Sequence, residues 1–124
     1  MRKLTTILAV VLLSACATVD RPDSSNLAAY CTADNAYRLG TQGKAYFGVC
    51  PKDTEGAFLA GLQRGRELVP KPPQALPYFT QMSELEKQLA IAGSDAERER
   101  IRARLRDAEF WAIHILNNPG SNMN

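Results

Sequence analysis

The sequence predicts an all-α protein, because three patterns typical of helices recur along its 124 residues. In two segments of the C-terminal half, apolar residues are spaced by three and four positions, which is the repeat of one helix face. Between these segments a glycine precedes a serine cap, a pattern that ends one helix and begins the next. In the N-terminal half, glycines and apolar residues share a helical face. We expect a disulfide-linked pair of glycine-containing helices, followed by an antiparallel helical hairpin.

The composition is that of one ordinary globular domain, with 45% apolar and 23% charged residues. These values are neither collagen-like nor typical of disorder, and the length excludes a multidomain enzyme. The net charge of +2 equals the contribution of Arg2 and Lys3, so the remaining chain is neutral. A globally basic nucleic-acid-binding protein is therefore not expected.

The first residues have the layout of a secretory signal. Arg2 and Lys3 precede an apolar run that is far shorter than the roughly 20 residues needed to cross a bilayer. The run ends at Leu13-Ser14-Ala15-Cys16, which resembles the lipobox of bacterial lipoprotein precursors. This resemblance implies that residues 1–15 are a signal peptide and that Cys16 is lipidated, with palmitate among the acyl chains. The alternative is an ordinary signal peptide cut after Ala17.

The residues that follow Cys16 predict a location. Acyl chains contribute roughly 0.8 kcal/mol per buried methylene, so several chains would hold the protein on a membrane. By resemblance to Gram-negative sorting signals, Ala17 in place of aspartate implies the outer membrane, with the protein facing the periplasm. Residues 16–26 are polar and rich in chain breakers, which predicts a flexible tether between the lipid and the domain.

The periplasm is oxidising, and Cys31 and Cys50 are the pair that remains after lipidation of Cys16. We predict a disulfide between them, which would contribute on the order of 3 kcal/mol by the chain-entropy model. A metal site would need more ligands, and the only histidine is the distant His114. A catalytic thiol would need a local base, and none is visible. We expect no metal and no cofactor.

Residues 27–69 are predicted to form the disulfide-linked core. Each of two units has a cysteine, an aspartate suited to cap a helix (Asp34 or Asp53), an aromatic residue and two glycines. Glycine inside a helix costs about 1 kcal/mol relative to alanine, so close approach of two helix backbones is the expected compensation. The glycines concerned are Gly40, Gly43, Gly61 and Gly65.

This segment also resembles a known family. The resemblance is carried by Tyr30-Cys31, Asn35, Gly40-x-x-Gly43, Tyr46, Gly48-Val49-Cys50-Pro51, Ala57-Phe58, Gly61 and Gly65-Arg66. The pattern is similar to domain of unknown function 2799, an uncharacterised lipoprotein family of Gram-negative proteobacteria. The resemblance implies an envelope lipoprotein, but it supplies no activity and no catalytic residues.

Residues 70–77 are rich in proline and predict a stiff connector, after which a hairpin is expected over residues 78–118. Its arms should pack as a short antiparallel coiled coil, with Gly93 ending the first arm and Ser94-Asp95-Ala96-Glu97 as the capping box of the second. Residues 119–124 should form a flexible tail. The seam residues are Met82, Leu85, Leu89 and Ala92 in the first arm, and Ile101, Leu105, Ala108, Ala112 and Ile115 in the second.

The second arm carries the candidate partner-binding residues. Five arginines alternate from 98 to 106, and nearby acids favour a solvated, self-paired surface. The sharper hypothesis is that Arg102, Arg104 and Arg106 lack local partners and bind an anionic group. Phe110 and Trp111 are candidate anchors, for which the domain core is favoured over a partner protein.

No local motif indicates catalysis. Gly-x-Ser-x-Gly is absent, and Glu84 and Glu86 stand two positions apart, on different faces of a helix surface. His114 is expected to be structural or on the surface. We therefore expect a non-enzymatic structural or interaction component of the envelope, with an envelope protein or peptidoglycan as partner. The alternative is a small cell-wall-processing hydrolase, or a regulator of one, that uses acids distant in sequence.

Overall fold

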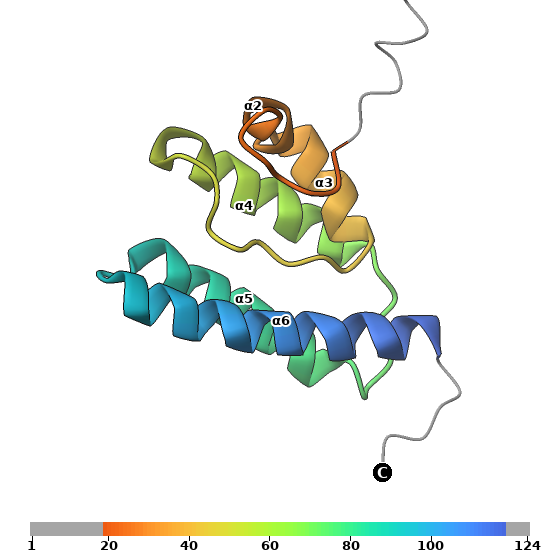
Figure 1. Ribbon diagram of the computed structural model, residues 1–124. Helices are drawn as coiled ribbons and strands as arrows, with labels where there is room; N and C mark the ends of the chain where they lie inside the picture. Colours follow the sequence, from red (N-terminus) through yellow and green to blue (C-terminus); the bar gives the residue numbers. More distant parts are fainter. Residues whose placement is uncertain (1–18, 119–124) are drawn as a thin grey trace, which may run out of the picture.

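The computed structural model describes residues 19–118, and all secondary structure in that range is helical. Two packed units are arranged one above the other, with α2–α4 in the first and the α5–α6 hairpin in the second (Figure 1). The predicted all-α class is confirmed. The predicted signal peptide, Cys16 and the predicted tail at 119–124 lie outside the described residues. The helices are α2 (Leu27–Tyr30), α3 (Ala33–Thr41), α4 (Lys52–Glu67), α5 (Leu76–Ile91) and α6 (Asp95–Asn117).

Glycines allow α3 and α4 to pack at close range. A Cβ placed on Gly40 of α3 would overlap the backbone of α4, and a Cβ on Gly61 or Gly65 of α4 would overlap the backbone of α3. The predicted close approach is therefore confirmed at these positions. Gly43 has a different role, because it follows α3 with φ of 79°, a conformation that glycine adopts without strain and that turns the chain.

The two predicted aspartate caps are wrong. Thr32 caps α3, since its side chain accepts a hydrogen bond from the amide of Asn35, and Pro51 precedes α4 with no side-chain cap. Asp34 and Asp53 lie instead in the first turns of these helices. Carboxylates in a first turn still interact favourably with the positive end of the helix dipole, so the two residues suit the helix starts without capping them.

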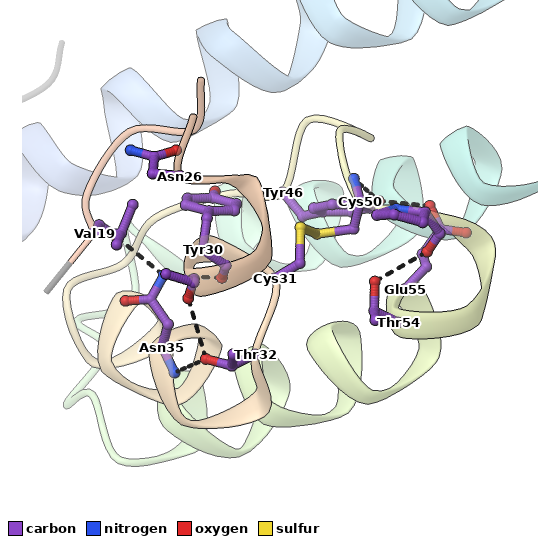
Figure 2. The surroundings of a disulfide bond; sticks show 12 residues. Val19, Asn26, Tyr30, Cys31, Thr32, Asn35, Tyr46, Cys50, Thr54 and Glu55 are labelled. Carbon is purple, nitrogen blue, oxygen red and sulfur yellow. Dashed lines mark hydrogen bonds between the residues drawn. A yellow bond between two sulfur atoms is a disulfide. The ribbon is translucent and has the colours of Figure 1, made fainter. Parts of the chain in front are cut away.

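The disulfide between Cys31 and Cys50 is present, with a Cα–Cα distance of 5.7 Å. It links the end of α2 to the segment that precedes α4 (Figure 2). Next to it, the ring of Phe58 lies 5.1 Å from that of Tyr46 and 5.2 Å from that of Tyr30. The covalent link therefore closes over an aromatic core.

The α5–α6 hairpin is confirmed, and its predicted seam is buried except for Ala92, which is partly buried. α5 begins at Leu76, so the connector is shorter than predicted, and Pro77 occupies the first turn, where its missing amide hydrogen costs nothing. Ala92, rather than Gly93, is the C-cap of α5. Ser94 caps α6 as predicted and accepts a hydrogen bond from the Glu97 amide at 3.2 Å.

The segment at 42–51 runs between the two units (Figure 1, yellow). Ala45 packs into the core of the hairpin, whereas its neighbour Tyr46 packs into the aromatic core beside the disulfide. Gly48 turns the segment with φ of 78°. Consecutive residues therefore contribute to different cores.

The described part of the predicted tether, residues 19–26, is fixed to the domain rather than free. Val19 is partly buried against the aromatic core, and its carbonyl accepts hydrogen bonds from Asn35 Nδ2 at 3.0 Å and Arg38 Nη2 at 2.8 Å. Asp20 pairs with Arg38 at 2.8 Å. The composition of this segment predicted flexibility, but α3 supplies a specific set of donors for its backbone and carboxylate.

Candidate functional site

A buried ion pair joins the two units. Arg66 of α4 is 3% exposed and Glu86 of α5 is 1% exposed, and Nη1 of the arginine lies 2.7 Å from Oε1 of the glutamate. Nη2 also bonds Glu86 and donates to the carbonyl of Lys44 at 2.8 Å. Glu86 accepts a further hydrogen bond from the amide of Tyr46 at 2.8 Å. The pair thus holds α4, α5 and the segment at 42–51 together.

The prediction that Glu86 lies on the helix surface is wrong. Glu86 stands four residues after Met82 and three before Leu89, so it belongs to the buried face of α5. That spacing was readable from the sequence. Its partner was not, because nothing local indicates that Arg66 lies opposite.

A second network lies beside the disulfide. Tyr46 Oη donates to Glu55 Oε2 at 2.6 Å and accepts from the amide of Cys50 at 3.1 Å. Burial, and next the hydrogen bond to Glu55, raise the pKa of Tyr46 well above its usual value. Lys52 pairs with Glu55 at 3.3 Å and donates to the carbonyl of Ala90 in α5 at 2.6 Å. These contacts anchor the start of α4 to the end of α5.

Glu109 of α6 forms a third connection between the units. Its Oε2 accepts a hydrogen bond from the amide of Ala45 at 2.7 Å, while burial raises the pKa of its carboxyl group. Burial, and next the nearby Glu109, raise the pKa of Tyr30 to about 12. Glu109 lines a small cleft of about 270 Å³ together with Asp20 and Arg21 of the entry segment.

Glu86 and Glu109 accept hydrogen bonds from amides of the segment at 42–51, far away in sequence, and Glu55 accepts one from Tyr46 of the same segment. Glu55, Glu86 and Glu109 therefore have an evident role in positioning the chain. Within residues 19–118, the structure contains no cluster of three or more histidine, cysteine or acidic side chains arranged to hold a metal ion.

The three candidate arginines of α6 do not form one surface. Arg102 is not unpaired, because its Nε donates to the carbonyl of Phe47 at 2.9 Å and its Nη1 pairs with Glu99 at 2.9 Å. Arg104 lines a shallow groove of about 510 Å³ between α6 and α5. Arg106 is exposed elsewhere on α6. The sequence could not reveal the role of Arg102, because the carbonyl that it binds is far away along the chain.

Phe110, Trp111 and His114 form an aromatic cluster on α6. The ring of Phe110 lies edge-on to Trp111 with centroids 5.1 Å apart, and parallel to His114 with centroids 6.1 Å apart. Phe110 is 59% exposed, so the preference for the domain core is wrong for this residue. The C-terminal turns of α6 instead meet the other unit through Ile113 and Leu116, which approach Gly43.

Another groove lies where the ends of the two units meet, and the sequence did not predict it. It has a volume of about 930 Å³, and its apolar walls include Val69, Ile113 and Leu116. Lys44 and Lys71 also line it. Lys71 donates to the carbonyls of Arg66 and Val69 at the end of α4, so this lysine stabilises the helix C-terminus.

Comparison with known proteins identifies one segment. No curated protein and no solved structure matches the chain. Residues 24–67 match a family described as "Protein of unknown function (DUF2799)". This segment contains α2, α3 and α4 and both disulfide-bonded cysteines. The chain therefore carries a domain of unknown function 2799, formed by the disulfide-linked helical unit.

Proposed function

We propose that the protein is an outer-membrane lipoprotein, anchored through Cys16, whose helical domain faces the periplasm and has a non-enzymatic, structural or protein-interaction role. The lipobox at Leu13-Ser14-Ala15-Cys16 and the oxidised Cys31–Cys50 pair support this proposal. From Val19 to Asn118, no helix combines the length and apolarity needed to span a bilayer.

The observation that carries the interaction role is the position of Arg104. Its guanidinium group has neither an ion-pair nor a hydrogen-bond partner among the described residues, and it borders the groove between α5 and α6. Gln81 and Gln88 of α5 line the same groove. A guanidinium group binds a carboxylate through two parallel hydrogen bonds, and side-chain amides both donate and accept. Glu84 also lines the groove, so the groove suits a polar segment of an envelope protein that places one carboxylate on Arg104.

Site-specific photo-crosslinking in intact cells tests this role. A benzophenone amino acid at Gln88 should capture a defined envelope protein, and Arg104→Ala should abolish that capture. Arg100→Ala is the matched control, because Arg100 is an exposed arginine of α6 outside the groove. Capture that survives Arg104→Ala, or that both variants reduce equally, would refute the groove as the binding site.

The alternative function is a cell-wall-processing hydrolase, or a regulator of one. The observation in its favour is Glu109, whose raised pKa and position at a cleft suit a general acid. The mature protein incubated with purified peptidoglycan should release no soluble fragments if the non-enzymatic proposal is right. Release that disappears in Glu109→Gln would establish the enzyme instead.

A further inference from the structure

The chain enters the domain at a fixed point. Asn35 and Arg38 both bond the carbonyl of Val19, and Arg38 also pairs with the next residue, Asp20. Figure 2 shows Val19 beside Asn35, on the side of the aromatic core that carries α2. The position of Val19 on the folded surface is thus set by several contacts to one helix.

The distance between this point and the lipid attachment is short. Consecutive Cα atoms are 3.8 Å apart, so the three peptide links from Cys16 to Val19 span at most about 11 Å. A compact domain of about 100 residues has a radius of gyration of about 13 Å. If Cys16 is lipidated, as the proposed function requires, the domain cannot move away from the bilayer by even its own radius. The surface around Val19 must therefore face the membrane.

The surface next to this entry point includes the outer side of α6. Asp20 and Arg21 share a cleft with Glu109, and Phe110 is the next residue along α6. Arg106 neighbours both Glu109 and Phe110 on the helix surface, because residues three and four positions apart are adjacent there. Phe110 follows Glu109 at about 100° around the helix axis, so the exposed phenylalanine, with Trp111 and His114 against it, lies on the side of α6 next to the one that faces Asp20 and Arg21.

We infer that the aromatic cluster of α6 (Phe110, Trp111 and His114) contacts the phospholipid headgroup region of the membrane that holds Cys16. Tryptophan, with its polar N–H edge, is favoured at the boundary between headgroups and acyl chains, and an exposed phenylalanine ring gains free energy by leaving water. This contact explains why Phe110 is 59% exposed in a domain with few large apolar side chains to spare. It also gives the short connection after Cys16 a function, since that connection holds one defined surface against the lipid.

Trp111 provides the test, because it is the only tryptophan of the chain. Cys31 and Cys50 are joined, so Cys16 is the one free thiol of the mature chain and can be coupled to a maleimide phospholipid in phosphatidylethanolamine–phosphatidylglycerol vesicles. Spin-labelled headgroups in these vesicles should quench Trp111 fluorescence. Inserting about twelve glycine and serine residues before Val19 allows a separation of about 20 Å, and should reduce the quenching about twofold or more.

Phe110→Ser is the surface variant, and its far-UV circular dichroism should match that of the unmodified chain because Phe110 is largely exposed. In the short-linker chain this variant should lower the quenching and shift Trp111 emission to longer wavelength. Quenching that is the same for the short and long linkers, or that Phe110→Ser leaves unchanged, would refute the membrane contact. The mass of the protein purified from cell membranes provides the separate test of lipidation. An unmodified Cys16 there would refute the lipoprotein proposal, whatever the vesicles show.

Discussion

Alanine at Gly65 should destabilise the domain, whereas alanine at Gly56 should stabilise it, although both residues lie in α4. A Cβ at Gly65 would meet the carbonyl oxygen of Tyr37 and the amide of Thr41, both in the backbone of α3. A Cβ at Gly56 would find no atom within 4 Å. The two substitutions therefore make the same chemical change, one at a helix contact and one in open space.

The expected magnitudes follow from these surroundings. In an exposed helix interior, alanine is favoured over glycine by about 1 kcal/mol, so Gly56→Ala should gain roughly that amount. Added volume in a tightly packed contact costs about 1 to 3 kcal/mol, and the upper end applies at Gly65 because backbone atoms cannot rotate away. After subtraction of the propensity gain, Gly65→Ala should lose about 2 kcal/mol. For a domain of this size, about 1 kcal/mol corresponds to 4–8 °C in Tm.

Thermal and urea unfolding, followed by circular dichroism at 222 nm, would measure both variants under non-reducing conditions. A thiol assay on each variant would verify that the Cys31–Cys50 disulfide has formed, so that only the helix contact differs. The Tm of Gly65→Ala should fall by about 8–16 °C, and that of Gly56→Ala should rise by about 4–8 °C. Equal shifts, or a more stable Gly65→Ala, would show that α3 and α4 are not in close backbone contact.

Three further predictions concern the networks around the two units. Arg66→Met and Glu86→Gln should each lower the free energy of unfolding in urea by about 3–5 kcal/mol, because each leaves one buried charge unpaired. The double variant should lose clearly less than the sum of the two single losses. Additive losses would contradict this coupling. Burial raises the pKa of Glu109, so the folded chain binds this proton more tightly than the unfolded chain. The resulting stabilisation of the wild type is present at low pH and is lost as pH rises above 4.5. The Tm of Glu109→Gln should therefore rise relative to that of the wild type between pH 4 and pH 7. A constant Tm difference between the two proteins over this range would refute the prediction. Removing the disulfide by Cys31→Ser with Cys50→Ser should cost on the order of 3 kcal/mol, and an unchanged urea midpoint would show that the link does not constrain the unfolded chain.

Features set by local spacing were predictable from the sequence. The buried seam of the hairpin followed from apolar residues three and four positions apart, and the start of α6 followed from Ser94 with Glu97. The close packing of α3 and α4 followed from helical glycines, because these residues need compensation for their conformational cost. In each case, the physical cause lies within a few residues of the feature.

The hydrogen bonds between polar groups of distant segments were not predictable, although the distant Cys31–Cys50 pair was. Arg102 belongs to an alternating run of charges, yet it bonds a carbonyl of the segment between the units. Val19 lies in a polar, breaker-rich stretch, yet its carbonyl binds two side chains of α3. The sequence gives the donors and acceptors at these positions, but which of them meet is decided by how the two units pack.

Because Ala45 and Tyr46 are buried in different cores, the two units should unfold together. Since neighbouring residues are buried in different units, neither unit can open without disturbing the other's packing. We expect a single unfolding transition in calorimetry, with matching calorimetric and van't Hoff enthalpies. Reducing the disulfide should then accelerate amide hydrogen exchange in α5 and α6, although both helices lie outside the covalent loop. The oxidation state of one pair of cysteines would in this way set the lifetime of the whole folded chain.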